Sequence, residues 1–538
     1  MVVTEDNNID HANRIEREHP TKHKERDWWK KSVFYQIYPR SFLDSNADGI
    51  GDIAGIRKKL DYLQLLGVDA LWISPIFPSP NKDFGYDIQD YCAIDPTFGT
   101  LKEFDGLIDD VHKRGMYIVM DGVFNHTSDQ HPWFQSSLKK EDKRDWYIWS
   151  QTPNNWTSAF GGSAWTYAPT RKKWYLHSFA KEQPDLNWDN PAVEEAILSI
   201  MEFWYQRGID GFRLDVFNCY HKKTGLPDNP KRWDWQGLIG GRFYSYINQE
   251  HIHDRDQPEL MGCLKRMRAL ADRYNAVLIG ETLDERLRYD NAAQYVGENK
   301  LHLAFHFQLL HTRWNPIKMT QACRELQRCF ATTWPNIVLS NHDFPRQSKR
   351  WGAAEERRKI MAFLSLTQKG TPFIYYGEEI AMQESTLPRK QILDPVGKRF
   401  WPFFSGRDGC RTPMQWDESP FGGFSAFEPW LPVHRDYRKR NVALQQRAPL
   451  SVWNTYRTLL QLRRQHSALH SGDQQWIASP SACLFYRRKT PEESLVCLLN
   501  LGNQSVEIPN VAGKILYHTH PDSSNLLRPY EGIIIKES

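Results

Sequence analysis

The sequence predicts an α/β protein with a parallel sheet of eight strands, an insertion after the third strand and a C-terminal β domain. Three observations predict this fold. Eight short apolar stretches alternate with helical patterns, the third connection is unusually long, and short β-like stretches replace the alternation after about residue 466. Eight is the number of strands that closes a barrel, but alternation alone does not distinguish a closed barrel from an open doubly wound sheet.

The predicted strands are short apolar runs, and helical patterns lie between most of them. The strands cover residues 33–38, 70–74, 117–121, 211–216, 277–281, 303–307, 337–341 and 373–376. Helices are expected at residues 56–66, 101–114, 191–207, 259–274 and 356–368. Pro191 stands just inside the start of the third of these helices and Gly208 just beyond its end, which is the usual placement of these two residue types.

Four changes of pattern divide the chain into four parts, one of which is interrupted by an insertion. Residues 1–26 are polar and charged and predict a flexible arm. Residues 27–124 and 188–465 form the domain with the eight strands. Residues 125–187 lack a clear helix that would return the chain to the sheet and are rich in Trp, Tyr, Gly, Ser and Pro. They predict an inserted domain over the carboxyl ends of the strands. Residues 466–538 predict an all-β domain, with strands at 482–487, 494–499, 505–508, 514–518 and 532–536.

Composition excludes several classes of protein. A net charge of +4, with Lys and Arg spread along the chain, gives no reason to expect a nucleic-acid or membrane partner. No apolar run approaches the length of a membrane span, and residues 1–26 lack the apolar core of a signal peptide. The eight Cys are scattered without a CxxC pair, which argues against a zinc site and a disulfide framework. We therefore expect reduced thiols and a cytoplasmic protein.

The fourth strand carries two charges near its end. Arg213 and Asp215 are two residues apart, so on a strand both side chains project from the same face. A guanidinium beside a carboxylate favours the ionised form of that carboxylate. A positioned, ionised carboxylate at a strand end can serve as a nucleophile. This stretch alone is equally well explained by a structural ion pair.

Carboxylates and histidines follow the apolar stretch in several of the strands. They are Asp121, His126, Asp215, Glu281, His342 and Asp343. In a barrel all of these strand ends converge on one face. A single acid at a strand end is more often a cap or ion-pair residue, but so many on one face indicate a catalytic site. Three carboxylates suit glycosidic bond cleavage, and neither HExxH-type ligand spacing nor a GxSxG, Walker or supported GxGxxG motif appears.

At these residues the chain resembles glycoside hydrolase family 13, the α-amylase family, and within it the α-glucosidase and oligo-1,6-glucosidase branch. The four blocks that carry the resemblance are residues 121–126, 211–215, 280–281 and 341–343. The resemblance covers about residue 27 to the end. It implies a (β/α)8 TIM barrel, a B domain in the third connection and a C-terminal antiparallel β-sandwich. It also implies a retaining, exo-acting α-glucosidase that releases terminal glucose from short α-glucosides by double displacement.

The resemblance also implies roles for individual residues. Asp215 would be the nucleophile, Glu281 the general acid and then the general base, and Asp343 the group that binds the 2- and 3-hydroxyls of the sugar. Arg213 would hold Asp215 ionised, and His126 and His342 would donate hydrogen bonds to hydroxyls of the same sugar.

Further residues would close the pocket around one glucose. By the same resemblance Asp83 would bind the 4- and 6-hydroxyls, Tyr86 would stack on the ring, and Arg411 would reach the same glucose. Phe160 and Phe179 would line the entrance. The alternatives are a Gly turn with an acidic cap for Asp83 and Tyr86, and simple core packing for the two Phe residues.

Residues 44–52 place oxygen ligands at alternate positions, as calcium-binding loops do. Similar loops in the oligo-1,6-glucosidase branch bind Ca²⁺ or Mg²⁺, and the matching positions here are Asp44, Asn46, Asp48, Asp52 and the carbonyl of Ile50. The expected role of the metal is structural. An Asp/Asn/Gly turn without a metal is the alternative, and no organic cofactor is expected.

The linkage that the enzyme would cleave is less clear from the sequence. Val216 follows the expected nucleophile, and in this branch Val there accompanies α-1,6 linkages. Residues 394–395, 406–413 and 423–425, however, resemble bacterial α-glucosidases with α-1,4, sucrose or transfer activity. Trehalose-6-phosphate hydrolases share Val216 but need a cationic phosphate pocket that the sequence does not locate. The motif associated with sucrose isomerases is not seen.

Two rival functions remain for the same chain. A sucrose- or maltose-active glucosyltransferase would use the same site, with a sugar hydroxyl in place of water. A non-catalytic relative of the transporter accessory chains would need a membrane span and usually lacks catalytic residues, whereas this chain keeps all three acids. The expected partner is a small oligosaccharide or disaccharide, and the expected state is a monomer or a weak homo-oligomer.

Overall fold

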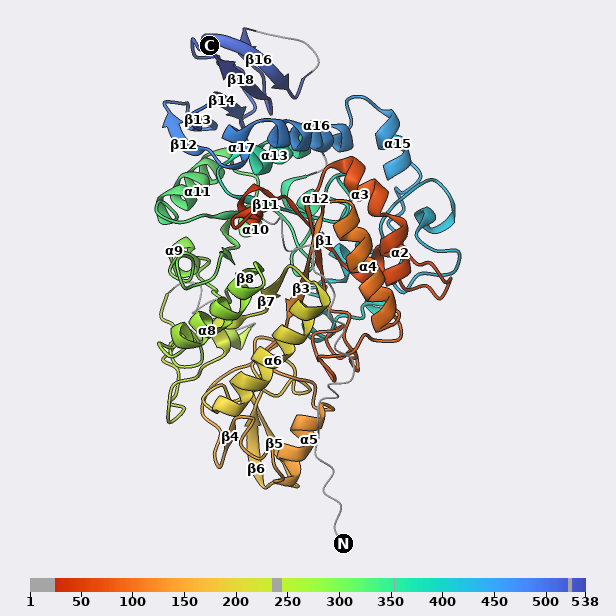
Figure 1. Cartoon of the computed structure of the whole chain (residues 1–538), viewed down its shortest axis with the longest axis vertical. Coiled ribbons are helices and arrows are strands. Elements are labelled where there is room, and N and C mark those ends of the chain that lie inside the picture. Colours follow the sequence, from red (N-terminus) through yellow and green to blue (C-terminus); the bar gives the residue numbers. More distant parts are fainter. Residues whose placement is uncertain (1–24, 235–243, 353, 521–524) are drawn as a thin grey trace.

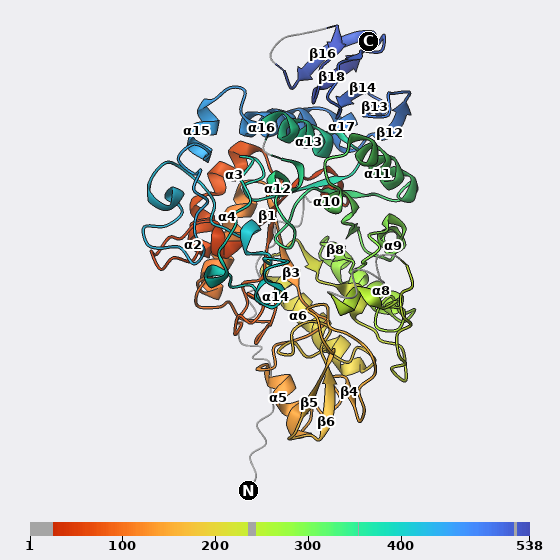
Figure 2. The same cartoon turned by 180° about the vertical axis from the view of Figure 1, so that it is seen from behind.

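The computed structural model describes residues 25–234, 244–352, 354–520 and 525–538. Most of the predicted N-terminal arm therefore lies outside the described residues. Figures 1 and 2 show an elongated molecule with two small sheets at opposite ends of its long axis and a larger helix-covered sheet between them. Among the described helices, none is long and apolar enough to cross a membrane.

The central sheet contains the eight strands that the sequence predicts. They are β1 (Phe34–Ile37), β2 (Ala70–Ile73), β3 (Tyr117–Gly122), β7 (Gly211–Leu214), β8 (Val277–Glu281), β9 (Leu303–Phe305), β10 (Asn336–Val338) and β11 (Thr371–Tyr375). Every paired neighbour is parallel, in the order β10-β11-β1-β2-β3-β7-β8-β9. The two end strands, β9 and β10, are consecutive in the chain. This cyclic order is that of a (β/α)8 barrel, so the barrel prediction is confirmed.

The barrel closes between β9 and β10 without a continuous ladder. His306, just after β9, lies with Nε2 2.9 Å from the carbonyl oxygen of Asn336 in β10. Aromatic side chains fill the inside of the barrel below the strand ends. Trp72 stacks on Phe305 with ring centroids 5.4 Å apart, and Phe34 stacks on Phe373 at 4.7 Å. We call this aromatic layer the floor of the barrel; the charged residues at the strand ends lie above it.

Helices follow most of the strands and cover the barrel (Figure 1). The longer ones are α4 (Leu101–Lys113), α6 (Pro191–Arg207), α8 (Leu260–Arg273), α11 (Pro316–Cys329), α13 (Glu355–Thr367) and α16 (Val452–Gln465). The shorter ones are α1 (Trp28–Lys31), α9 (Tyr289–Ala293), α10 (Gln308–His311), α12 (Gln347–Trp351), α14 (Pro395–Phe400), α15 (Val442–Arg447) and α17 (Ser467–His470). Asn190 caps α6, and Gly208 ends it with a left-handed φ of 105°.

One predicted helix is wrong. Residues 56–66 were expected as a single helix, but the chain forms α2 (Ile53–Lys58) and α3 (Leu60–Leu66). The two helices meet at Lys59, whose φ of −108° and ψ of 7° lie outside the helical range. The break lets both helices turn buried faces toward the barrel, with Ile53 and Ile56 on one and Leu60 and Leu63 on the other.

The insertion after β3 forms a small antiparallel sheet at one end of the molecule. Its strands are β4 (Trp149–Ser150), β5 (Trp165–Ala168) and β6 (Lys173–Leu176), in the order β4-β6-β5. A short helix, α5 (Pro132–Lys139), precedes this sheet and was not predicted. Its Pro at the first helical position and its cap at His131 are the signals that could have located it.

The C-terminal region forms two antiparallel sheets at the other end. The larger has the order β12-β13-β14-β18-β16, and the smaller pairs β15 with β17. The strands are β12 (Asp473–Ile477), β13 (Cys483–Lys489), β14 (Ser494–Asn500), β15 (Val506–Glu507), β16 (Gly513–His518), β17 (Leu526–Leu527) and β18 (Gly532–Glu537). Leu527 and Val506 of the smaller sheet pack with Phe485 and Val496 of the larger one. The prediction missed β12 and β17.

A glycine at the start of β7 sets how closely β7 approaches β8. A Cβ atom on Gly211 would lie 2.3 Å from the carbonyl oxygen and 2.5 Å from Cγ1 of Val277. We expect Gly211→Ala to lower the free energy of unfolding by about 1–3 kcal/mol, because the backbone of β8 must move. Gly262→Ala in α8 is the control: its nearest contact is Arg266 at 3.6 Å, and we expect a gain of roughly 0.5 kcal/mol. Urea denaturation of both variants measures the difference; equal effects would contradict it.

Candidate active site

Four acids stand where strands of the barrel end on one side. Asp121 is the second-last residue of β3, Asp215 directly follows β7, Glu281 ends β8, and Asp343 lies in the loop after β10. The last three open into one cavity of about 770 Å³. The acids at the strand ends therefore converge on one side of the barrel, as the sequence predicts.

A single buried arginine holds three of these acids together. Arg213 is 1% exposed and donates from Nη1 to Asp121 Oδ1 at 2.9 Å and to Asp215 Oδ1 at 2.7 Å. Its Nη2 donates to Glu281 Oε2. The guanidinium carbon lies 5.3 Å from the ring centre of Trp72, in the aromatic floor of the barrel. Register explains the meeting, because Asp121 pairs with Arg213 across β3 and β7.

The protonation of the two acids on either side of Arg213 differs. Burial raises the pKa of Asp215 to about 6, and the charge of Arg213 opposes this shift and keeps the pKa below 7. Burial, together with the charges of Asp215 and Asp343, raises the pKa of Glu281 to about 8. At pH 7 Asp215 is therefore mainly ionised and Glu281 mainly protonated. This division of labour is the one that an acid and nucleophile pair needs.

The pKa of Asp343 is held below its usual range. Burial works to raise this pKa, but the guanidinium groups of Arg407 and Arg411 outweigh burial. Arg411 Nη2 donates to Asp343 Oδ1 at 2.9 Å, and Arg407 Nη1 donates to the same oxygen at 3.2 Å. The carboxylate is thus fixed from behind while its other side faces the cavity.

The loop after β2 brings Tyr86 into the same group. The Tyr86 ring lies parallel to the His342 ring, 3° apart with centroids 5.3 Å apart, and its hydroxyl is 2.5 Å from His342 Nε2. Gln36 Nε2 lies 2.8 Å from His342 Nδ1, and Tyr86 Oη donates to Asp121 Oδ2 at 3.2 Å. Burial lowers the pKa of His342 to about 3, so the ring is neutral and its hydrogen bonds fix the tautomer.

The structure separates the predicted binding residues into two sets. Those that line the cavity are Asp83, Tyr86, His126, Phe160 and Phe179. Arg213, His342 and Arg411 lie behind the cavity wall and are each at most 1% exposed. Phe160 and Phe179 meet edge to face at 5.7 Å, and Phe179 lies 5.3 Å from His126. Burial lowers the pKa of His126 to about 4, so this ring is neutral as well.

Sequence reasoning missed Arg407, which lies closer to the cavity than Arg411 does. Arg407 Nη2 donates to Asp83 Oδ1 at 2.6 Å and to Asp394 Oδ1 at 2.7 Å, and its Nη1 reaches Asp343. It lines the cavity, and its guanidinium lies 5.3 Å from the ring centre of Phe160. A local signal for Arg407 exists, because it stands four residues before Arg411 in the stretch 406–413. The resemblance gave a role to Arg411 alone.

Gln183 from the inserted region was also missed. It is fully buried, lines the cavity, and donates from Nε2 to the carbonyl oxygen of Tyr86 at 3.2 Å and to Asp83 Oδ2 at 3.4 Å. Nothing in its local sequence marks it, because its partners come from the loop after β2. It shows that the inserted region completes the inner end of the cavity.

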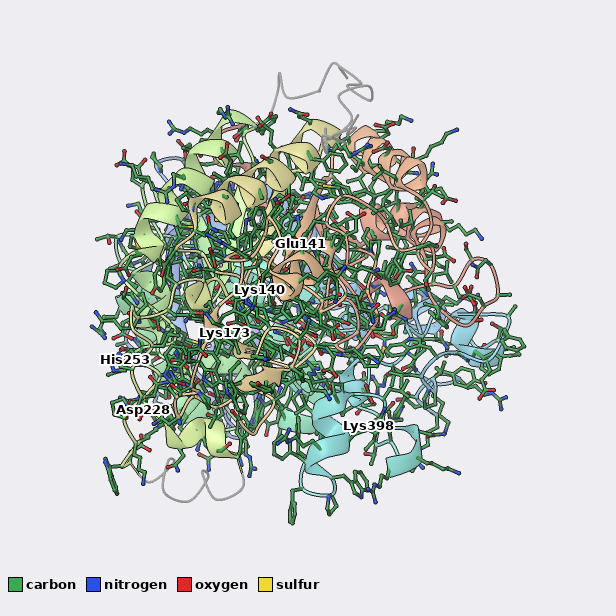
Figure 3. The ribbon with its side chains drawn as sticks, turned by 90° about the horizontal axis from the view of Figure 1, so that it is seen from below. Lys140, Glu141, Lys173, Asp228, His253 and Lys398 are labelled. Atoms are coloured by element: carbon green, nitrogen blue, oxygen red, sulfur yellow. The ribbon has the colours of Figure 1, made fainter. Side chains whose placement is uncertain are left out.

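The cavity is also lined by many apolar and aromatic side chains. Its walls include Val216, Tyr244, Tyr246, Leu287, Val396 and Phe404. Val216 adopts a left-handed φ of 35°, which is rare for a β-branched residue. Seen from below, the inserted sheet with Lys173, the loop with Asp228 and His253, and α14 with Lys398 occupy different parts of one face (Figure 3).

The predicted metal loop forms a compact turn. Asp44 accepts hydrogen bonds from the backbone of Asn46, Ala47 and Gly49 and from Ser425 Oγ, and these outweigh burial and lower its pKa. Asp52 caps α2 by accepting from Gly55. Within the described ranges, no group of three or more His, Cys, Asp or Glu side chains is placed to hold a metal. The oxygen donors fit a Ca²⁺- or Mg²⁺-type ion by chemistry, while the turn is closed by its own hydrogen bonds.

A barrel whose strand ends carry an ionised and a protonated carboxyl group in one sugar-sized cavity is the framework of a glycosidase. Residues 36–472 match the family model described as "Alpha amylase, catalytic domain". The chain belongs to the α-amylase family.

Similar proteins cover nearly the whole chain. A probable α-glucosidase of Rhizobium meliloti (strain 1021) is 42% identical over 506 residues, which are 90% of this chain and 92% of the relative. An oligo-1,6-glucosidase of Parageobacillus thermoglucosidasius is 38% identical and covers 92% of this chain and 94% of its own.

Solved structures agree with the family. The α-glucosyl transfer enzyme XgtA has a TM-score of 0.89 at 37% identity and covers 95% of this chain and 99% of its own. The trehalulose synthase MutB from Pseudomonas mesoacidophila MX-45 has a TM-score of 0.85 at 33% identity, with the same two coverages.

Arg407 should be needed for stability because it compensates buried acids. Arg407→Met leaves Asp83 and Asp394 without the guanidinium that contacts both, and removing one partner of a buried ion pair costs about 3–5 kcal/mol. We expect a loss of that size in the free energy of unfolding, measured by urea denaturation. Lys398→Met, at an exposed site of α14, is the matched control and should change stability by less than about 0.5 kcal/mol. Equal stability of both variants would refute the ion-pair role.

Proposed function

We propose that the protein is a retaining, exo-acting α-glucosidase that releases terminal glucose from short α-glucosides. The observation that carries the proposal is the pair formed by ionised Asp215 and protonated Glu281 on either side of Arg213 in one cavity. Retaining glycosidases need a nucleophilic carboxylate and a proton donor in this relation.

The reaction then follows from the protonation states. Asp215 attacks the anomeric carbon while Glu281 donates its proton to the leaving oxygen, which gives a covalent glucosyl-enzyme. Glu281, now ionised, takes a proton from water, and the resulting hydroxide displaces Asp215. Asp343, held ionised by two arginines, is placed to bind sugar hydroxyls and to stabilise positive charge on the ring.

Closure of the inner end supports removal of one glucose at a time. Asp83, Arg407 and Gln183 are joined by hydrogen bonds and all line the cavity, where together they can form an end wall. Tyr86, with its ring fixed against His342, offers a flat surface for the sugar. A chain of sugars could not continue past such an end wall, so binding would begin with the non-reducing glucose.

We propose a preference for α-1,6 linkages, with α-1,4 linkages as the alternative. Val216 lines the cavity beside the nucleophile, and several relatives are named oligo-1,6-glucosidases. A transfer or isomerising activity on the same site is the second candidate, favoured by the similar structures of an α-glucosyl transfer enzyme and a trehalulose synthase. In that case a sugar hydroxyl replaces water in the second step.

The deciding experiment is hydrolysis of isomaltose, maltose, sucrose, trehalose and trehalose 6-phosphate side by side, with full product analysis. We expect glucose to be released fastest from isomaltose. Faster cleavage of maltose or sucrose, or disaccharide products in place of glucose, would move the assignment to the alternatives. Activity confined to the phosphorylated sugar would point to a trehalose-6-phosphate hydrolase. Asp215→Asn must abolish every activity; cleavage that survives in this variant would sink the mechanism.

The pH dependence of kcat/KM should be bell-shaped. Asp215 must be ionised, so activity should rise with pH through about 6, and Glu281 must be protonated, so activity should fall above about 8. In Glu281→Gln we expect kcat/KM for isomaltose to fall by about 10²–10⁴-fold. With p-nitrophenyl α-glucoside as the substrate, whose leaving group needs little protonation, the pH profile of Glu281→Gln should have no alkaline limb. An alkaline limb that persists in this variant would assign it to another group.

We propose that residues 44–52 bind a structural Ca²⁺ or Mg²⁺ through Asp44, Asn46, Asp48, Asp52 and the carbonyl of Ile50. The support is the run of oxygen donors at alternate positions and the ionised, nearly buried Asp44. The metal would brace the loop beside β1 and would take no part in the chemistry.

Removal of this metal should lower thermal stability. We expect EDTA to reduce the melting temperature and added Ca²⁺ to restore it, because an ion that binds only the folded state stabilises that state. Asp48→Ala should lose the response to Ca²⁺, whereas Glu141→Ala, at an exposed site labelled in Figure 3, should keep it. Differential scanning calorimetry with and without the ion tests this, and identical melting curves would leave the loop as a plain turn.

We also propose a cytoplasmic protein that acts as a monomer or weak homo-oligomer on small saccharides, without a nucleic-acid or membrane partner. All eight cysteines are free thiols, which suits a reducing compartment. Cell fractionation and light scattering after size-exclusion chromatography test location and assembly.

A further inference from the structure

A second groove, separate from the active-site cavity, lies between α5, α6 and the loop after β2. It encloses about 760 Å³ and shares no lining residue with the active-site cavity. One stripe of α6 forms a wall, with Glu195, Ser199 and Phe203 at helical spacing. His131 and Trp133, at the start of α5, form the opposite wall. We call this space the α5–α6 groove; α5 and α6 are neighbours in Figures 1 and 2.

His131 presents a fixed hydrogen-bond donor to the groove. Its Nδ1 accepts from the backbone N–H of Trp133 at 3.0 Å, so the proton of the neutral ring is on Nε2. The residue is only 5% exposed, and Nε2 has no hydrogen-bond partner in the described parts of the chain. Burial lowers the pKa of His131 to about 3, which keeps the ring neutral. This neutral donor has no acceptor in the described parts of the chain and is available to an acceptor on a ligand.

Trp133 supplies a flat apolar surface beside this donor. It is half-buried, and its ring plane is held by an edge-to-face contact with Trp146 at 4.7 Å and 67°. Carboxylates of Asp90 and Glu195 stand at the exposed rim and can accept hydrogen bonds from hydroxyl groups. A flat ring, a neutral donor and rim acceptors are the features by which a neutral sugar is recognised: its C–H face packs on the ring while its hydroxyls are hydrogen-bonded.

We propose that the α5–α6 groove is a second saccharide-binding site that holds one end of a short α-linked glucan. The groove matches the active-site cavity in volume, so it can hold a sugar unit of the same kind. Its floor touches the active site: Tyr91 donates from Oη to the carbonyl oxygens of Val123 at 2.9 Å and His126 at 2.8 Å. The α-glucan identity of the ligand rests on the proposed function, whereas the recognition of a sugar rests on the groove itself.

The test is calorimetric titration of Asp215→Asn with isomaltotriose and, separately, maltotriose, before and after saturation of the active site with deoxynojirimycin. We expect the saturated protein to bind one molecule of oligosaccharide per chain. Ser199→Trp, which fills the groove from the exposed side of α6, should abolish this residual binding. Lys139→Trp, an equally bulky change at an exposed position of α5 outside the groove, should leave it intact.

A conservative variant isolates the donor. His131→Asn keeps the cap of α5, because Asn is a favoured capping residue, but removes Nε2–H from the groove. We expect residual binding to weaken by about threefold to tenfold, the loss of one hydrogen bond. Trp133 is left in place because it also packs against Trp146. Absence of residual binding, or residual binding unchanged by Ser199→Trp, overturns the proposal.

The two proposals fail differently. If the wild-type protein hydrolyses α-glucosides but the saturated protein binds no oligosaccharide, the groove proposal is wrong and the proposed function stands. If no α-glucoside is hydrolysed, yet oligosaccharide binding is lost in Ser199→Trp, the proposed function is wrong and the groove stands.

Discussion

The site depends on one buried guanidinium that three carboxyl groups share. Arg213 is almost fully enclosed, and without Asp121, Asp215 and Glu281 its charge would have no compensation inside the barrel. Conversely, three acids at such close range could not carry negative charge near neutral pH without the cation. Burial and the arginine act in opposite directions on each acid. The pKa of each group records which effect is stronger, and at Asp215 and Glu281 burial is stronger by different amounts.

The remaining parts of the site come from segments distant in sequence. Asp83 follows β2, Gln183 belongs to the insertion, and Arg407 follows β11, yet hydrogen bonds join all three. The barrel thus supplies the reacting acids, and the irregular connections supply the end wall. Such a division explains how related proteins of one fold can carry names as different as glucosidase, transfer enzyme and trehalulose synthase, since connections vary more easily than strands.

Much of the fold and the centre of the site could be predicted from the sequence because they are local patterns. Apolar runs located all eight barrel strands, and a spacing of two residues placed Arg213 beside Asp215. The helix break at Lys59 and the two-residue strand β17 leave weak local signals, so they were missed. Gln183 was missed because only its long-range partners identify it, whereas Arg407 had a local signal in its spacing of four residues from Arg411. The raised pKa of Asp215 depends on how completely the strand end is enclosed, which no spacing reveals. The domain boundaries and the metal loop stay predictions.

The seam of the barrel has a consequence for Asp343. Strand β10 forms a ladder with β11, but in the described sheet it forms none with β9, where a contact from His306 spans the gap. The acid that follows β10 therefore stands on a strand anchored along one edge. Arg407 and Arg411, both from the long connection after β11, clamp Asp343 from outside the sheet. Ion pairs from a loop therefore hold Asp343 in position, whereas the strands that carry the other acids are held by backbone pairing on both edges. The position of Asp343 thus depends on side chains of the connection after β11.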